Sequence, residues 1–317
     1  LSTNIYSSSL NNQEMFDDLQ VISMSTKFNK YKFSASIKET SIEYLSDLHR
    51  LLTYSSSLNY IKDNFNIKVL TESVINRSTK TIDTTKNFYL FSLEKRTDIS
   101  KIEMHNSIKF EFDKKSKTVY SYDIIFKVSP LNNISSSITY SRNYKKPNFN
   151  DLLWKPFGNA YLKNEFSNNF YIKNILLTNY GQLDINFHYI DFHDLISWRP
   201  MVGTNAYWIP DNISSAKSFG GDIYVRSNEI KGFTSSFSAS YLKTENYDDS
   251  INEQHSGKML IYTPKLSAFI KIIKKYKTQT FYITSKFVGE RIYRYNWPKD
   301  NILPSYFFGS LAYERHI

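Results

Sequence analysis

Apolar and polar side chains alternate along most of this chain, one residue to the next. In the segment 102–112 one set of alternate positions is mainly apolar and the other is polar or charged, and 120–128 repeats the pattern. Successive side chains of a β-strand point to opposite faces, so this period of two predicts strands with one apolar and one polar face. Further segments of this kind are 31–38, 51–60, 65–75, 134–142, 183–189, 233–241, 280–288 and 305–313. We expect about fifteen strands in the whole chain.

No segment carries a helical repeat over helical length. The nearest candidate, 149–154, is short and lies between Pro147 and Pro156. Because proline limits how far a helix can extend, we expect no helix there. The sequence therefore predicts an all-β chain.

The length of the strands and the chemistry of their polar face favour a membrane barrel. The alternation often outlasts the ~5–6 residues of an average strand and approaches the ~9–11 residues of a membrane-spanning one. The polar face carries Ser, Thr, Asn, Lys, Glu and His, which suits a hydrated interior, and the apolar face is rich in Tyr and Phe. Hydrocarbon tolerates no open sheet edge, so such strands predict a closed antiparallel transmembrane β-barrel with its apolar face outward.

The connections in the second half alternate in length. Short connections are expected around 180–182, 229–232 and 274–277, and long ones at 200–212, 246–257 and 295–303. Outer-membrane barrels alternate short periplasmic turns with longer extracellular loops in this way. The alternative is a soluble β-sandwich or propeller with amphipathic sheets.

Composition removes other classes of protein. Cys is absent from the 317 residues, which excludes disulfide scaffolds and thiol catalysis. No apolar run reaches the ~20 residues of a spanning helix. Aromatic residues make up 16% of the chain, which excludes simple disorder. The formal net charge is +10, but the basic residues are dispersed, so we expect no nucleic-acid partner.

The most specific stretch of the sequence is 140–165, YSRNYKKPNFNDLLWKPFGNAYLKNE. It resembles a signature near the middle of TonB-dependent outer-membrane receptors, in which a strand ending in Ser-Arg is followed by Pro-x-x-Asn-(Asp/Glu)-Leu, Gly-Asn and Leu-Lys-Pro-Glu. Asn164 stands where that family usually has Pro. The positions that match are Ser141, Arg142, Pro147, Phe149, Asn150, Asp151, Leu152, Trp154, Gly158, Asn159, Leu162, Lys163 and Glu165.

Three further segments resemble the same family in the same order. The segment 194–198 resembles a strand end before an extracellular loop, 212–222 an Asn-x-x-x-Ala-x-x-x-Gly-x-Glu strand with Asp222 for Glu, and 262–265 the start of the strand after the next loop. The resemblance runs from about 134 onward, and the first half matches only as amphipathic strands.

The resemblance implies a receptor and transporter barrel in the outer membrane of a Gram-negative-type bacterium. We expect residues 1–317 to be one incomplete barrel domain, about fifteen strands of a larger barrel, with the plug domain outside this chain. Its implied partners are outer-membrane lipid, its own plug, through the plug the TonB complex, and a scarce bulky ligand such as cobalamin, haem or an iron-siderophore complex. The form of the motif, NDLLW followed by GN, favours the cobalamin branch.

Ligand contacts are expected from the extracellular loops and the upper wall of the lumen, where aromatic surfaces meet a few polar groups. The alternative for each candidate is a place in the aromatic girdle. Asn150, Asp151 and Glu165 are expected to structure loops, because side chains of this kind cap backbone donors. The candidate ligand residues are Trp154, Phe157, Trp198, Arg199, Tyr207, Trp208 and Trp297.

Catalysis and metal binding find little support. His188 and His193 are five positions apart, which places them on opposite faces of a strand. His193 beside Asp191 and Asp194 is interpreted as a solvated strand end, and 248–249 lacks the spacing of a calcium loop. A Ser-His-Asp hydrolase in the barrel wall is the remaining enzyme alternative. We expect no catalytic residue, no metal and no cofactor, and two hypotheses remain: a receptor-type transporter barrel, or a soluble extracellular β protein that binds carbohydrate or protein.

Overall fold

The fold is a single large antiparallel sheet with little else. The computed structural model describes residues 2–6, 15–44, 47–79, 83–113, 118–155, 157–200, 208–247, 257–294 and 299–315. These residues form eighteen strands and one short helix. No helix in the described ranges is long and apolar enough to cross a membrane.

The first nine strands precede the helix. They are β1 (Ser2–Tyr6), β2 (Met15–Phe28), β3 (Tyr31–Tyr44), β4 (Asp47–Lys62), β5 (Phe65–Ser78), β6 (Thr84–Ile99), β7 (Ile102–Asp113), β8 (Val119–Leu131) and β9 (Ile134–Lys145). The helix and the remaining strands are α1 (Phe149–Leu153), β10 (Glu165–Thr178), β11 (Gly181–Pro200), β12 (Trp208–Ser227), β13 (Phe233–Asn246), β14 (Leu266–Tyr276), β15 (Gln279–Val288), β16 (Arg291–Arg294), β17 (Asn301–Leu303) and β18 (Tyr306–Arg315).

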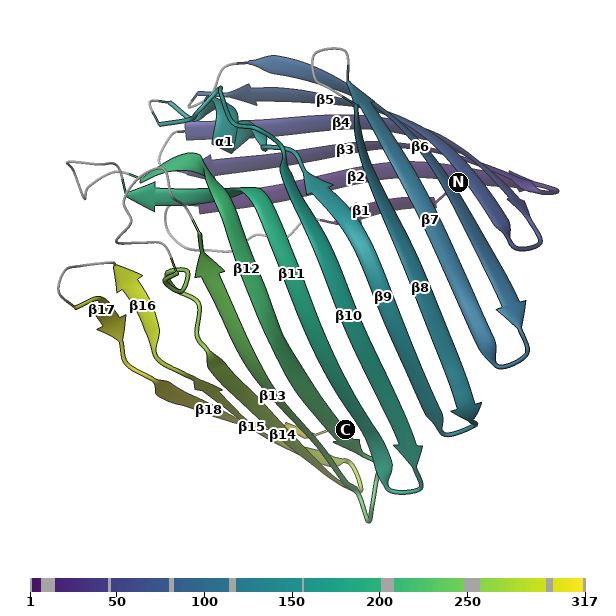
Figure 1. The fold of residues 1–317 in the computed structure, drawn as a ribbon, viewed down its shortest axis with the longest axis vertical. Helices are drawn as coiled ribbons and strands as arrows, with labels where there is room; N and C mark the ends of the chain where they lie inside the picture. The colour runs from purple at the N-terminus through teal and green to yellow at the C-terminus, as the bar shows by residue number, and fades with distance from the viewer. Residues whose placement is uncertain are drawn as a thin grey trace.

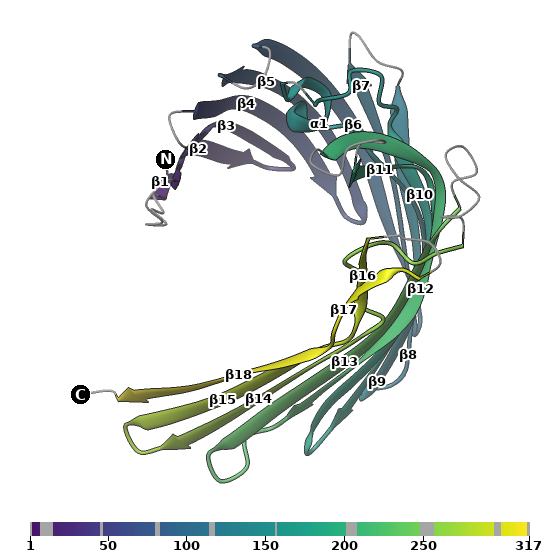
Figure 2. The same ribbon diagram turned by 90° about the vertical axis from the view of Figure 1, so that its left-hand side faces the viewer.

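Sixteen strands form one sheet, each paired with its neighbour in sequence from β1 to β15, with β18 after β15. The strands β16 and β17 form a separate hairpin. The large sheet curves into a trough that is open between β1 and β18, as Figures 1 and 2 show. Incomplete closure agrees with the expected part of a barrel, with sixteen strands in the sheet where about fifteen were expected.

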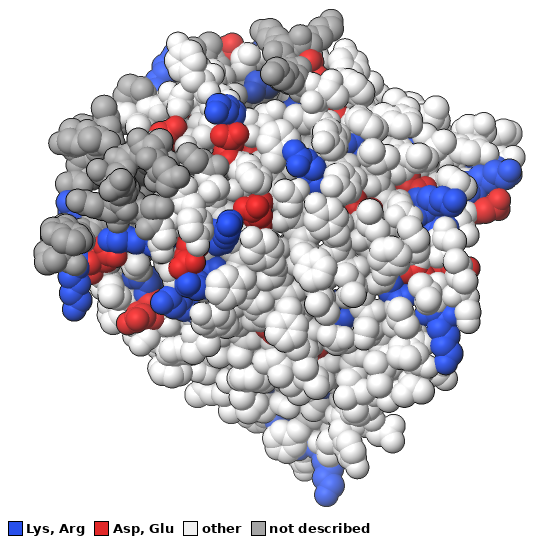
Figure 3. All heavy atoms as spheres, in the orientation of Figure 1, with Lys and Arg blue, Asp and Glu red and all other residues white. Residues whose placement is uncertain are grey.

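The distribution of side chains is the reverse of that in a water-soluble sheet. Large apolar side chains on alternate positions are exposed on the outer face, for example Phe187 at 55% and Phe237 at 41%. Buried positions on the inner face are mainly polar: Ser218 and Thr244 share a 2.8 Å hydrogen bond, and Asn169 donates to Ser141 at 3.2 Å. Figure 3 shows the outer face, where uncharged side chains cover the area between charges at the loop ends of β11–β13 and basic side chains at the lower tip. The alternation predicted from the sequence is therefore confirmed, with the apolar set outward.

The two ends of the sheet differ in their connections. At one end two-residue turns join β2 to β3, β4 to β5, β6 to β7 and β14 to β15. Their first residues, Asn29, Asp63, Ser100 and Lys277, have φ between 48° and 55°, as tight hairpin turns require. At the other end longer segments join β9 to β10, β13 to β14 and β15 to β18. We call these the turn end and the loop end.

Three local expectations are wrong. The segment 149–154 does contain a helix, α1. Capping contacts stabilise this single turn, and a helix so short has no hydrophobic repeat by which the sequence could predict it. The connection expected at 200–212 shrinks to 201–207, since β11 continues to Pro200 and β12 begins at Trp208. The strand expected to start within 262–265 begins only at Leu266. Tyr262 has a φ of 59°, a left-handed backbone that does not fit a strand.

Candidate functional site

The candidate site lies at the loop end, where the segment between β9 and β10 folds onto the inner side of the sheet. Figure 2 shows α1 inside the trough. The Nζ of Lys86, on β6, lies 5.0 Å from the centre of the Phe149 ring, and the Nζ of Lys146 lies 5.0 Å from the ring of Phe88. Lys146 also pairs with Glu111 of β7 at 2.8 Å. These contacts hold one flank of the loop against β6 and β7.

The helix α1 is specified by its first residues. The Asn148 side chain accepts a hydrogen bond from the Asp151 N–H at 2.8 Å, and Asp151 Oδ2 accepts one from the Asn148 N–H at 3.0 Å. This reciprocal capping box satisfies two backbone donors that a helix start otherwise leaves open. Because a helix of five residues is marginal alone, tertiary contacts must hold it in place.

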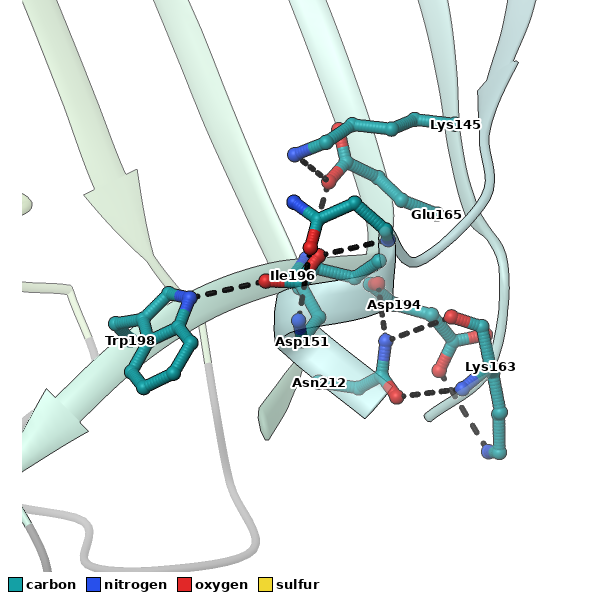
Figure 4. A network of polar contacts seen from close by, with 9 residues as sticks. Lys145, Asp151, Lys163, Glu165, Asp194, Ile196, Trp198 and Asn212 are labelled. Atoms are coloured by element: carbon teal, nitrogen blue, oxygen red, sulfur yellow. Dashed lines mark hydrogen bonds and ion pairs between the residues drawn. The ribbon is translucent and has the colours of Figure 1, made fainter. Parts of the chain in front are cut away.

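Asp151 joins the helix to β11. Its side chain is 3% exposed, and Oδ1 accepts a hydrogen bond from Trp198 Nε1 at 3.0 Å (Figure 4). Both oxygens of this buried carboxylate therefore have partners, one from the loop and one from a strand 47 residues away. Leaving either donor unpaired would lower the free energy of unfolding by about 1–3 kcal/mol.

After the helix the chain doubles back at Gly158. A Cβ at this position would lie 2.5 Å from the Trp154 nitrogen and 2.8 Å from the Leu153 nitrogen, both backbone atoms that cannot move aside cheaply. The next residue, Asn159, donates from its backbone to the Asp151 carbonyl at 2.7 Å and from its side chain to the Pro210 carbonyl at 3.3 Å. Glycine is thus required for the loop to reach β12.

Glu165 accepts a backbone hydrogen bond from the part of β11 that extends beyond its pairing with β10. The pairing of β10 with β11 ends at Phe166 opposite His193, while β11 continues to Pro200. Beyond that point Glu165 Oε2 accepts a hydrogen bond from the Ile196 N–H at 3.0 Å, and the Lys145 ammonium lies 3.6 Å away. At 8% exposure this carboxylate satisfies a backbone donor that the end of the ladder leaves open (Figure 4).

The side chain of Asn212 on β12 also hydrogen-bonds to backbone groups, here of the loop before β10 and of β11. Its Oδ1 accepts from the Lys163 N–H at 2.8 Å, and its Nδ2 donates to the carbonyls of Lys163 at 3.2 Å and Asp194 at 2.7 Å (Figure 4). Asp194 has a φ of 52°, a left-handed backbone that Asp tolerates better than most residues. The side-chain amide of Asn212 thus bonds both the N–H and the carbonyl of Lys163, as the backbone of a neighbouring strand would.

The predicted ligand residues are only partly brought together. Trp198 binds Asp151, and Trp208 packs against Tyr262 with ring centres 6.4 Å apart. Trp154 is the C-cap residue that follows α1, and Phe157 lies half-buried in the loop. Arg199 lies in β11 opposite Ile209. Tyr207 and Trp297 lie outside the described residues.

The family-motif residues divide by position. Arg142 lies on β9, with its guanidinium 5.4 Å from the ring centre of Tyr120 and 5.2 Å from that of Phe166. Most of the others lie in the segment between β9 and β10, and Glu165 begins β10. Pro147, Leu152, Gly158, Asn159 and Leu162 are half-buried there, Asn150 is exposed, and Asp151 and Glu165 are buried.

Sequence reasoning did not assign roles to Asn148 and Asn212. The spacing Asn-x-x-Asp from 148 to 151 is a capping-box signal visible in the sequence. Asn212 begins the segment 212–222 that resembles the family, but nothing local indicates its partner, Lys163, which is 49 residues away. Among the described residues no group of three or more His, Asp or Glu side chains is arranged to hold a metal ion.

Comparison with known proteins agrees with this architecture. The family model for the TonB dependent receptor-like β-barrel matches residues 25–313. The chain belongs to this family. Its members are outer-membrane receptors and transporters of Gram-negative bacteria, so the apolar outer face meets lipid and the soluble alternative is not favoured.

The fold matches solved receptors over nearly the whole chain. A variant of the ferric enterobactin receptor PfeA from Pseudomonas aeruginosa, in complex with enterobactin, superposes with a TM-score of 0.71 and 12% identity, over 96% of this chain and 55% of that one. The FrpB iron transporter from Neisseria meningitidis gives 0.72 and 9%, over 95% and 57%. The chain therefore spans about half the length of these receptors.

Sequence similarity is higher over a shorter stretch. The vitamin B12 transporter BtuB of Vibrio vulnificus is 31% identical over 96 residues, 30% of this chain and 16% of that protein. BtuB of Photobacterium profundum is 33% identical over 109 residues, 32% of this chain and 18% of that protein.

Proposed function

We propose that this chain forms most of the wall of a barrel that imports a scarce, bulky ligand, with no covalent chemistry of its own. The observation that carries the proposal is the loop of 146–164, which folds into the trough and is fastened to both flanks. A braced loop narrows the loop-end opening and holds aromatic side chains at a fixed position there. Concave aromatic surfaces with a few polar groups are typical of ligand sites.

The edges of the sheet support a larger barrel. Within the described part of the chain, β1 and β18 each have one strand neighbour, so each presents a row of backbone groups that no described strand pairs with. Because hydrocarbon does not tolerate such edges, we propose that strands outside this chain complete the barrel. The polar inner face then surrounds the plug domain through which a TonB complex drives uptake.

Cobalamin is our first choice of ligand. The support is the form of the 150–159 motif and the two vitamin B12 transporters that share 31% and 33% identity with part of the chain. An iron-siderophore complex is the second choice, because the solved receptors that match the fold include siderophore receptors, although at 12% identity or less. The proposed contacts are Trp154, Phe157, Trp198, Arg199, Tyr207, Trp208 and Trp297.

Growth rescue tests this proposal. The receptor is expressed in a cobalamin-requiring strain that lacks its own vitamin B12 receptor, and growth is followed on limiting cobalamin, with uptake of labelled cobalamin measured in parallel. We expect rescue that depends on TonB, and loss of uptake in the W154A/W208A double variant.

The matched control is Y180A, which removes an exposed aromatic side chain at the turn end and should leave uptake unchanged. Rescue of an iron-uptake strain by ferric siderophore, without cobalamin rescue, would move the assignment to the second ligand. Absence of uptake for both, with the protein folded in the outer membrane, would contradict the proposal.

A further inference from the structure

Small hydroxyl side chains form the inner face of β13. Its inward positions from the turn end are Thr234, Ser236, Ser238 and Ser240. The strands β12 and β14 flank β13 in the wall of the trough (Figure 2), and their inward side chains are larger there. These larger side chains are Tyr224 and Arg226 on β12, and Phe269, Lys271 and Ile273 on β14. A polar groove therefore follows β13 inside the trough, with a floor of Ser and Thr.

Two hollows lie at the turn end of this groove. One has a volume of about 260 Å³, and its lining includes Arg226, Ser236 and Lys271. The other has a volume of about 600 Å³, shares Arg226 and Thr234 with the first, and reaches Lys275 near the turn between β14 and β15. Short turns mark the periplasmic end of such barrels, so the hollows open where a ligand that crosses the lumen would leave it.

Arg226 and Lys271 stand on either side of one serine. Strand pairing places both residues opposite Ser236, so the three side chains form one row across β12, β13 and β14 on the inner face. Neighbouring strands are ~4.8 Å apart, which puts the Cα atoms of the two basic residues about 10 Å from each other. Two long cationic side chains can meet one small anion across that distance, and the Ser236 hydroxyl can donate to it from the floor.

The two cations of this row are not neutralised by neighbouring carboxylates. Neither Arg226 nor Lys271 forms an ion pair with a carboxylate in the described part of the chain. Carboxylates nearby have other partners: Asp184 accepts a hydrogen bond from Gln182 at 2.7 Å, and Glu229 lies 3.9 Å from the ammonium of another lysine. The row therefore combines two positive charges and a hydroxyl group with adjoining open space.

We propose that Arg226, Ser236 and Lys271 bind an oxyanion group of the imported ligand, a phosphate or a carboxylate, as its last contact with the wall before the periplasm. The inference rests on the proposed function and adds an exit subsite to it. The planar guanidinium of Arg226 matches the geometry of such a group, and the Lys271 ammonium supplies a compact charge from the other side. Cobalamin, our first choice of ligand, carries a phosphodiester group that fits this chemistry.

Selective thiol modification tests the anion site directly. This chain contains no Cys, so Ser236→Cys in the complete receptor, with any Cys outside this chain replaced by Ser, places one thiol between the two cations. An anionic and a cationic methanethiosulfonate are compared, each relative to its rate with a free thiol in solution. We expect the anionic reagent to be favoured about tenfold, because the two cations raise its local concentration. Inorganic phosphate should slow the reaction more than sodium chloride of equal ionic strength.

The charge variant and a second thiol position control this measurement. R226Q/K271Q in the Ser236→Cys background should remove both the preference for the anionic reagent and the protection by phosphate. Ser240→Cys lies on the same strand and the same face, opposite Asp222 instead of a cation. It should show no preference for the anionic reagent and no protection by phosphate beyond that by chloride. Heat-modified gel mobility verifies that each variant is folded.

Uptake measurements test the role of the site in transport. R226Q/K271Q should bind cobalamin at the cell surface as the unaltered receptor does, and import it about threefold more slowly, because the two cations no longer attract its anionic group to the exit. The matched control is K68Q/K109Q, which removes two inward lysines that flank Ser92 on the other side of the trough. Ser92 is only 8% exposed, so that row offers less room for a ligand, and uptake should be unchanged.

Three results would overturn the proposal. The first is equal normalised reaction of the Ser236→Cys thiol with both reagents, or no protection by phosphate. The second is no reaction with either reagent in the complete receptor, which would indicate that the plug fills the groove. The third is equal import by R226Q/K271Q and K68Q/K109Q. If the unaltered receptor imports no cobalamin, the proposed function fails, and the thiol measurements still decide whether the anion site exists.

Discussion

The two ends of the sheet are held by different kinds of contact. At the turn end, two residues connect most neighbouring strands, and a left-handed residue such as Asn29 or Ser100 sets the turn. At the loop end, hydrogen bonds join residues 47 to 51 positions apart, between the segment after β9 and the ends of β11 and β12. Each two-residue turn is therefore specified locally, with further contacts only between adjacent hairpins, such as Asn228 Nδ2 to the Asn179 carbonyl. The loop end is specified by side chains that meet only after the strands have paired.

This difference predicts how far the structural effect of a substitution should extend. A change within a two-residue turn should alter that hairpin and at most the hairpin beside it, because turn-end contacts such as Lys274 Nζ to the Lys231 carbonyl join adjacent hairpins. A change at the loop end should alter the position of α1, the ends of β11 and β12 and the aromatic residues near them. The same residues hold the proposed ligand contacts, so of these two kinds of change only those at the loop end should affect uptake beyond their effect on stability.

The largest effect is expected from Gly158→Val. The added side chain meets the backbone of Leu153 and Trp154, so the loop cannot keep its path to β12. We expect a loss of about 3 kcal/mol in the unfolding free energy, new protease cleavage within 146–164 and loss of uptake. Urea unfolding in lipid vesicles, limited proteolysis and uptake assays measure these three quantities.

The control for this variant is Gly309→Ala on β18. Its added Cβ would meet only Thr284 O, at an ordinary 3.5 Å. Stability, cleavage and uptake should match those of the unaltered receptor. Uptake by a folded Gly158→Val receptor would show that the loop is not braced as the structure indicates.

The link between Asp151 and Trp198 should give the next largest effect. Asp151→Ala leaves the Trp198 N–H and the Asn148 N–H without their acceptor, so we expect a loss of about 2–3 kcal/mol. A double-mutant cycle with Trp198→Phe should give a coupling free energy of about 1.5–3 kcal/mol in urea unfolding.

The matched pair at the opposite end is Tyr282 and Glu314, whose hydroxyl and carboxylate are 3.0 Å apart on exposed positions. The cycle of Tyr282→Phe with Glu314→Ala should give only about 0.2–1 kcal/mol, since solvent replaces the contact. Equal coupling free energies for the two pairs would contradict the prediction that buried loop-end contacts stabilise the barrel more than exposed turn-end contacts.

Much of the sheet could be predicted from the sequence because burial in lipid imposes a strict period of two. The prediction weakened where strands leave the bilayer. β11 continues to Pro200, and its last residues carry polar and aromatic side chains without alternation, since both faces there meet water or loop. The alternation therefore ended before the strand did, and the connection at 200–212 was predicted too long.

The candidate site was predictable only in part. The Asn148–Asp151 capping box is local, and the expected loop-structuring role of Asp151 and Glu165 agrees with the backbone N–H groups that they accept from. The pairing of Asn212 with Lys163 depends on the register of β10, β11 and β12, which no short stretch of sequence determines. The same holds for Trp198, which was predicted as a ligand residue and donates its indole N–H to Asp151.

A smaller effect is expected at Glu165. Glu165→Ala leaves the Ile196 N–H without its acceptor and should cost about 1–2 kcal/mol, whereas Glu165→Gln keeps an acceptor oxygen and should cost less than about 1 kcal/mol. Hydrogen exchange at Ile196 gives a direct measure, and faster exchange is expected only in the Ala variant. Glu229→Ala, an exposed carboxylate at the turn end, should change stability by less than about 0.5 kcal/mol.

The smallest effect, with the opposite sign, is expected at Ser100 in the turn between β6 and β7. Its φ of 55° is a left-handed backbone that glycine adopts without steric cost. Ser100→Gly should therefore raise the unfolding free energy by about 0.5 kcal/mol, because relief of the left-handed strain exceeds the entropy that glycine adds to the unfolded chain. Ser100→Val should lower it by about 1–2 kcal/mol, since a β-branched side chain disfavours this backbone. Urea midpoints measure both effects. Uptake by either folded variant should equal that of the unaltered receptor, because Ser100 lies at the opposite end of the sheet from the 146–164 loop.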